Sequence, residues 1–408
     1  MTDRLQQYPG RVLIEEVTHT TGDITANITD LVSEINIHSS MHIDSTFGEI
    51  LLIDYSNYVV GSRMIAGDVI SIRISHNDVS TTYDFKIKAL TDIQNGESGR
   101  TYNVKLVSEL QYNSYFRKVS KAYAGTTSDI AGVIFSENTS EQFNIWEPSL
   151  GVQSLIIPAL SPIKSINWLA GRSKSITSQS KFVFFQDSKL RYNFLSIPKL
   201  RDLYGSAPVT YRYSPNTFGE DTGGAIIPNS SGEMTSIIRL DYLNSYDVEK
   251  AVDAGSLFIT RIRVDHTQKE VDFQQNNYWD TFVENGVNTG SQWKYEDMSP
   301  GKVEIVSKAR DTTPFGFNDA PGIMTMPYID RSQEIEIQVF GNNLVDIGQI
   351  IRVEIPAAAP LDRVDSSGLD ARWSGNYYVT AKRDKIDRRT HIMVLRCTKD
   401  SQITGDYE

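Results

Sequence analysis

Cysteine is almost absent from this sequence, because Cys397 is the only one among 408 residues. A single cysteine cannot form a disulfide within the chain, so packing and hydrogen bonds must hold the fold together. Long apolar runs are missing as well. No segment approaches the roughly 20 apolar residues of a membrane helix, and no apolar signal region follows Met1. We therefore expect a soluble protein that folds and assembles in a reducing cytosol, with no membrane binding by itself.

Basic residues are outnumbered by acidic ones, at 40 Lys and Arg against 51 Asp and Glu, which gives a formal net charge of −11. A surface of that sign repels phosphate, and this argues against a dedicated nucleic-acid binder. Hydrophobic residues make up 39% of the chain, which is enough for packed cores. The length predicts about two to four domains.

The motifs of common catalytic sites are also missing: there is no Gly-x-Ser-x-Gly elbow, Walker loop or Gly-x-Gly-x-x-Gly turn. His19, His38 and His42 fall in one region, with Asp44 close by. A metal site needs three or four converging ligands, and no further cysteine or His-x-x-x-His spacing completes one. We interpret the histidines as surface residues and expect no metal, no cofactor and no catalytic residue. Replacing His42 or Asp44 with alanine should affect only folding and assembly.

Acidic pairs and aromatic runs allow weaker functional interpretations. Glu220-Asp221 and Glu296-Asp297 could supply the two carboxylates of a glycosidase, but almost any acidic chain offers such pairs. We interpret them as solvated loops. Replacing Glu220 with alanine should affect only folding and assembly. Tyr278-Trp279 and Trp293-Lys294-Tyr295 could stack on sugars or bases, although packing in a core or an interface is the commoner use.

The dominant periodicity of the chain is two, the period of β-strands. Ile70, Ile72 and Ile74 alternate with polar residues, and the same pattern occurs at 83–87 and 102–106. Alternation places apolar side chains on one face of a half-buried strand. Loop-forming clusters such as 92–99 separate these runs. They predict an antiparallel barrel or sandwich over about residues 10–112.

The middle of the chain has a different pattern. Thr127-Ser128-Asp129 precedes apolar residues at helical spacing, and Ser161-Pro162 opens a second amphipathic helix that ends at Gly171. Apolar runs on either side of Asp187-Ser188-Lys189 predict a hairpin. The following stretch, 206–232, is rich in Pro, Gly, Asn, Ser and Thr and indicates a linker or a long surface loop.

Four C-terminal segments repeat N-terminal segments in the same order. The pairs are 334–337 with 34–37, 348–355 with 67–74, 377–381 with 83–87, and 390–395 with 101–106. Any two amphipathic strands look alike, but four pairs in one order indicate a duplication. We therefore predict a mainly β fold with two related antiparallel β-barrels and α+β insertions. The predicted domains are an N-terminal barrel at 1–115, an α/β insertion at 116–205, a loop-rich β domain at 206–333 and a second barrel at 334–408.

One string in the insertion is distinctive. A helix with Pro162-Ile163 and Trp168-Leu169 leads into Ser180-Lys181-Phe182-Val183-Phe184-Phe185-Gln186-Asp187. This resembles the helix and hairpin of the central baseplate hub protein of T-even-like contractile-tailed phages, a family related to the hub part of type VI secretion spike proteins. Tyr8-Pro9-Gly10 and the overall length also fit. The resemblance is specific over about residues 155–200 and does not extend to 206–330.

The resemblance implies a structural virion protein, not an enzyme. Members of the family are homotrimers with two tube-type barrels per chain, so three chains make a pseudo-sixfold ring. Such a ring adapts the hexameric tail tube to the trimeric central spike. The implied partners are the spike trimer, tube or tube-initiator proteins and baseplate wedge proteins, with DNA only passing through the channel. No spike-like β-helix pattern follows Cys397, so the spike should be a separate chain.

Two other functions stay open at this point. A carbohydrate- or receptor-binding tail protein would also be β-rich, acidic and aromatic-bearing, although this chain lacks the repetitive shaft usual in a trimeric fibre. An enzyme acting on the cell wall is the third possibility, and the missing nucleophile and metal motifs argue against it.

Overall fold

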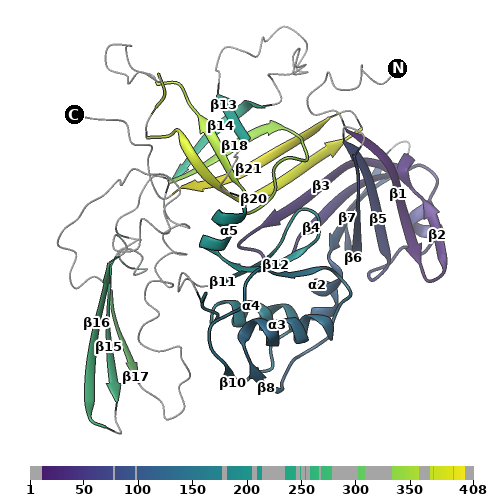
Figure 1. Cartoon of the computed structure of the whole chain (residues 1–408). Helices are drawn as coiled ribbons and strands as arrows, with labels where there is room; N and C mark the ends of the chain where they lie inside the picture. Colours follow the sequence, from purple (N-terminus) through teal and green to yellow (C-terminus); the bar gives the residue numbers. More distant parts are fainter. Residues whose placement is uncertain are drawn as a thin grey trace.

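The computed structural model describes residues 12–76, 79–96, 99–176, 182–204, 209–213, 235–244, 258–265, 268–277, 302–307, 333–357, 368–370, 372–388 and 390–399, with the single positions 249 and 253. Strands dominate this part of the chain and form one 13-stranded sheet and three small sheets. Figure 1 shows two β bodies side by side and a mixed domain beneath them. The mainly β fold predicted from the sequence is confirmed.

The N-terminal β body is built from the alternating segments. Its elements are β1 (Leu13–Thr21), β2 (Ile24–Asn27), the 3-10 helix η2 (Thr29–Leu31), β3 (Val32–Ser40), β4 (Phe47–Asp54), α1 (Tyr58–Gly61), β5 (Val69–His76), β6 (Val79–Gly96) and β7 (Gly99–Val107). The strand order is β3-β4-β7-β6-β5-β1-β2. β6 continues through most of the predicted loop 92–99, with a bulge after Thr91.

The gap between β1 and β3 is bridged without a strand ladder. In the described chain β1 pairs with β2 and β5. The backbone N–H of Ile28 donates to the carbonyl of Val17 at 2.8 Å, and the N–H of Val17 donates to the hydroxyl of Thr29 at 2.7 Å. Side chains complete the closure, because Val17 and Ile28 share one buried core with Ile35 and Ile50.

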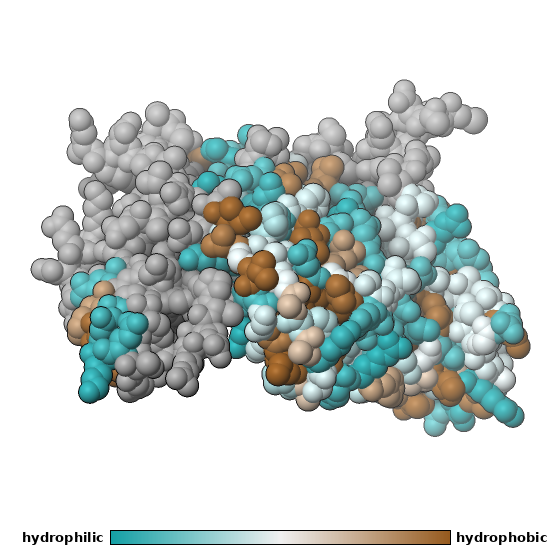
Figure 2. All heavy atoms as spheres, turned by 60° about the horizontal axis from the view of Figure 1, so that its bottom comes forward, coloured by the Kyte–Doolittle hydropathy of each residue, from teal (hydrophilic) through white to brown (hydrophobic). Residues whose placement is uncertain are grey.

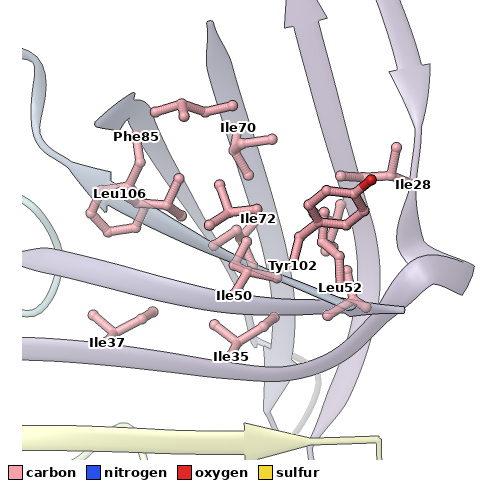
Figure 3. Packing of buried hydrophobic residues seen from close by; sticks show 14 of the residues in the cluster. Ile28, Ile35, Ile37, Ile50, Leu52, Ile70, Ile72, Phe85, Tyr102 and Leu106 are labelled. Atoms are coloured by element: carbon pink, nitrogen blue, oxygen red, sulfur yellow. The ribbon is translucent and has the colours of Figure 1, made fainter. Parts of the chain in front are cut away.

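Figure 3 shows part of this core, in which labelled side chains from β3, β4, β5, β6 and β7 and from Ile28 point toward one another. Ile50, Ile72, Phe85 and Leu106 are each 1% exposed or less. Each large apolar side chain buried in this way stabilises the fold by about 1.5–3 kcal/mol. The two-residue alternation predicted from the sequence therefore does define the inward face.

The C-terminal β body is a closed six-stranded barrel. It consists of β13 (Val209–Tyr213), β14 (Ser236–Asn244), β18 (Gln333–Phe340), β19 (Ile350–Glu354), β20 (Gly375–Asp387) and β21 (His391–Lys399). β13 lies parallel to both of its neighbours, and the other pairs are antiparallel. Two of these strands come from the range 206–333, which we had assigned to a separate domain. Of the predicted linker 206–232, only 209–213 is described.

The two β bodies have the same strand order when the strands of each body are numbered along the chain. β3-β4-β7-β6-β5-β1 corresponds to β14-β18-β21-β20-β19-β13. Gly67 and Gly348 both have positive φ, at 100° and 80°, and precede equivalent strands. The N–H of Gly67 donates to Ile87 and that of Gly348 donates to Val379, each at 2.9 Å. A bulge directly follows Ile87 and Val379 in their strands. This agreement supports a duplication.

Some details of the predicted repeat were wrong. The sequence alignment paired segment 334–337 with 34–37, which lies on β3. Segment 334–337 instead lies on β18, whose position in the strand order is equivalent to that of β4. The hydrogen bonds match Val379 with Ile87, whereas the sequence alignment paired it with Phe85. A shift of two residues keeps the same face of a strand inward, so the alternation alone could not reveal it.

The inserted domain packs beneath the barrels around its own core. It contains α2 (Glu109–Ser114), β8 (Ala122–Gly125), α3 (Thr127–Ser136), β9 (Phe143–Ile145), β10 (Gln153–Ile156), α4 (Pro162–Ala170), β11 (Phe182–Gln186), β12 (Tyr192–Ser196) and α5 (Ile197–Tyr204). Both predicted helices and the predicted hairpin are present. The hydroxyl of Thr126 caps α3, so the string Thr127-Ser128-Asp129 forms its first turn. The apolar stripe of α4 packs in a core with Phe182 and Phe194.

A separate three-stranded sheet lies away from these domains (Figure 1). Its strands are β15 (Phe258–Asp265), β16 (Glu270–Asn277) and β17 (Lys302–Ser307), in the order β16-β15-β17. Among the helices of the described residues, none is long and apolar enough to cross a membrane.

Candidate functional site: the junction of the barrels

The two β bodies are joined edge to edge, because β3 pairs antiparallel with β20 over seven residue pairs from Ala381–Ser40 to Asp387–Glu34. Side chains reinforce this seam. The guanidinium of Arg383 donates twice to the Asn36 amide oxygen, at 2.9 and 3.1 Å. Lys385 forms an ion pair with Glu34 at 3.1 Å. One hydrogen-bonded sheet therefore runs through both barrels.

Gln186 ties the inserted domain to the N-terminal barrel. Its amide oxygen accepts the backbone N–H of Thr46 at 2.9 Å, and its amide nitrogen donates to the carbonyl of Leu190 at 3.0 Å. Gln186 and Thr46 are both fully buried. An apolar side chain at position 186 would leave a buried N–H without its partner, which is costly. The site thus requires an amide that can accept and donate.

The next residues of this turn reach the C-terminal barrel. The carboxylate of Asp187 accepts the N–H groups of Lys189 and Arg191, each at 2.9 Å, and pairs with the Arg191 guanidinium at 2.7 Å. The N–H of Ser188 donates to the carboxylate of Asp346 at 2.9 Å. Burial raises the pKa of Asp187, and the nearby charge of Asp346 raises it further. The turn Gln186–Ser188 thus contacts both barrels.

A chain of hydroxyl groups lies beside this turn. The Ser45 and Ser108 hydroxyls are 2.8 Å apart, and the Ser108 hydroxyl is 2.7 Å from the phenol oxygen of Tyr192. Ser108 also caps α2, where its side chain accepts the N–H of Gln111. These bonds fix the angle at which the chain leaves the N-terminal barrel and enters the inserted domain.

Glu141 is a carboxyl group near the junction with a strongly raised pKa. Burial, together with the charge of Glu109, raises its pKa to about 7. Its oxygens still accept the N–H of Leu110 at 2.8 Å and the amide of Gln186 at 3.3 Å. Protonation of this group near neutral pH is therefore coupled to the packing of α2 against the turn.

A buried ionic cluster lies where the two barrels meet. Asp384 accepts from His391 at 2.8 Å and forms an ion pair with Lys382 at 3.3 Å. Lys382 also donates to the carbonyl of Val345 at 3.1 Å. Burial acts to raise the pKa of Asp384, but its interactions with Lys382 and His391 hold that pKa below its ordinary value. An adjoining cavity of about 20 Å³, lined in part by Tyr83, is large enough for one water and too small for a substrate.

The comparisons with known proteins concern the fold. A tail protein from Neisseria meningitidis MC58 superposes with a TM-score of 0.55 at 12% identity, covering 94% of this chain and 96% of that chain. The 43 kDa tail protein of prophage MuSo2 from Shewanella oneidensis gives 0.54 at 10% identity, over 96% and 100%. This chain has the fold of those phage tail proteins. A chain of the Francisella PdpA–VgrG complex gives 0.53 at 9% identity, over 98% of this chain and 60% of that chain. No known protein family and no curated protein matches the sequence.

Within this tail-protein fold, the sequence string that carried the resemblance lies at the junction. Gln186, near the end of the string, contacts the N-terminal barrel, and Ser188, the residue directly after the string, contacts the C-terminal barrel. The string itself carries no sign of these partners, because Thr46 is 140 residues away from Gln186 in the chain. No local pattern could have indicated this contact.

The histidines have structural environments that the sequence did not reveal. His19 is only 1% exposed, so its interpretation as a surface residue was wrong. Its ring nitrogens lie 2.9 Å from the Tyr58 phenol and from the Asp68 carboxylate. His38 stacks on Phe47 with ring centroids 4.7 Å apart. His42 is exposed, as expected.

Other candidate residues are not gathered into a site. Asp44 accepts the side-chain amide of Asn167 at 2.7 Å, on the surface between two domains. Within the described ranges no three His, Cys, Asp or Glu residues are placed to hold a metal ion. The remaining candidates lie outside the described residues: Glu220-Asp221, Glu296-Asp297, Tyr278-Trp279 and Trp293-Lys294-Tyr295.

Proposed function

We propose that this protein is the structural hub of a phage tail baseplate, a homotrimer with no catalytic role. The observation that carries the proposal is the pair of β bodies with one strand order, joined edge to edge through β3 and β20. Three such chains around a threefold axis present six similar units. That arrangement suits a protein placed between a hexameric tail tube and a trimeric central spike, with the wedge proteins of the baseplate around it.

The channel of this ring should have a neutral or acidic wall, so that DNA can pass without binding. The net charge of −11 per chain favours this sign. Two cations near the seam have acidic partners, since Lys385 pairs with Glu34 and Arg396 pairs with Glu334. A cation already paired with a carboxylate holds phosphate less strongly.

The proposal is tested by the mass and symmetry of the assembled protein. Sedimentation and mass photometry of the full chain, alone and with a trimeric spike protein, should give three copies per particle. Class averages from electron microscopy should show a ring with six similar lobes. A monomer at every concentration, both alone and in the assembled tail, would refute the hub. A hydrolytic activity on sugars or peptides that was abolished by Asp44→Ala would refute the non-enzymatic part.

A further inference from the structure

One face of the separate three-stranded sheet is uncharged and largely apolar, with Thr260 and Gln275 as polar members. Residues opposite one another in a ladder point to the same side, which places Phe273, Ile262 and Ile305 in one row. Val271 and Val303 lie in the two adjacent rows of that face. Phe273 is 68% exposed and Ile305 is 73% exposed. The opposite face carries charged residues such as Asp272.

A sheet of three strands is stable only when it buries an apolar face. Here four large side chains of that face are about half exposed or more, at 49–73%. A cluster of this kind on a protein with net charge −11 indicates a surface that is covered in the assembly. We name it the sheet face: Ile262, Val264, Val271, Phe273, Val303 and Ile305.

The inserted domain has a second surface of the same type. In the ribbon of β8 and β10, Ala122 lies opposite Ile156 and Ala124 lies opposite Ser154. Val152 precedes them in the same alternation, and these five side chains are all exposed, with Val152 at 70% and Ile156 at 69%. We name this the ribbon face. Figure 2 shows hydrophobic residues on the inserted domain and again on the separate sheet.

We propose that the sheet face of one copy of this chain packs on the ribbon face of the next copy. A cyclic trimer needs two different complementary patches, because each subunit contacts its two neighbours through different surfaces. The two faces meet this requirement, since both are built from β-strands, largely apolar and uncharged. Packing them face to face would bury both at the ~10 Å spacing of stacked sheets. The proposal rests on the trimeric hub and names the surfaces that hold it together.

The first test changes the charge of each face. Ile156→Asp and Ile305→Asp place a carboxylate on the ribbon face and on the sheet face. Each should weaken trimer formation at least about tenfold, because each buries a charge among apolar side chains. Leu344→Asp is the matched control, since Leu344 is equally exposed, at 65%, on the C-terminal barrel. The circular dichroism of all three variants should match that of the parent chain, which shows that they fold.

The second test joins the two faces covalently. Cys397 is fully buried, so introduced cysteines are the accessible thiols for a short bis-maleimide. The double variant Ile156→Cys with Phe273→Cys should give covalent trimers, and either single variant should give monomers. Covalent dimers from a single variant would overturn the proposal, because a face would then pair with itself. Trimers that persist unchanged in both Asp variants would overturn it and leave the hub intact. A parent chain that is monomeric throughout would instead refute the trimeric hub.

Discussion

Replacing Gln186 with leucine should destabilise the protein by about 2–6 kcal/mol. The substitution removes the acceptor of the buried Thr46 N–H and the donor to the Leu190 carbonyl, at 2.9 and 3.0 Å. Each buried polar group left without a partner costs about 1–3 kcal/mol. Leucine fills most of the space of glutamine, so little of the loss would come from a cavity.

The free energy of unfolding can be measured by urea titration, and amide exchange at Thr46 reports the broken contact directly. Gln142→Leu is a matched control, because Gln142 is exposed in the same domain and donates to Asn144 at 3.1 Å. We expect that control to stay within about 0.5 kcal/mol of the parent. If Gln186→Leu loses no more stability than Gln142→Leu, the turn does not hold the domains together.

Three further changes test the packing and the charges at the junction. Glu141 has a pKa of about 7 against an ordinary 4.5, so the folded protein binds a proton there that the unfolded chain releases. Stability should therefore fall by up to roughly 3 kcal/mol as pH rises from about 4.5 to 7, and urea titrations of Glu141→Gln should lack this slope. Gly341→Ala would place its Cβ 2.0 Å from the His391 ring, for a loss of about 1–3 kcal/mol, whereas Gly61→Ala meets nothing within 4 Å and should be neutral in the same thermal scan. Asp384→Asn should cost about 3–5 kcal/mol by leaving Lys382 buried without its carboxylate. Because the pKa of Asp384 is lowered, its contribution is lost as pH falls below about 4, and the variant should show less acid sensitivity than the parent.

Elements with strong local signals could be predicted from the sequence. The alternation at 70–74 and 102–106 identified β5 and β7 with the correct inward residues. Ser161-Pro162 located the start of α4, because a proline at the first helical position acts locally, although the Ser161 side chain forms no cap hydrogen bond. The repeated segments indicated the duplication, since glycine at 67 and at 348 meets the same backbone requirement in both copies.

Features that depend on distant contacts could not be predicted. β13 lies in a stretch rich in loop-forming residues and becomes a strand because it fits between β14 and β19. His19 is buried by partners 39 and 49 residues away, so its neighbours in sequence gave no sign of its environment. The contacts of Gln186 are equally remote. Tertiary context overrides local propensity in each of these cases.

The shared seam also affects how the protein is made. β3 is synthesised early, but its partner β20 is translated more than 300 residues later. Until then the nascent N-terminal body keeps an unpaired strand edge, which is open to mispairing with other chains. The last part of the chain therefore completes the first domain as well as its own. Ribosomes that stop before residue 375 should release a protein prone to aggregation, even though the whole N-terminal barrel sequence is present.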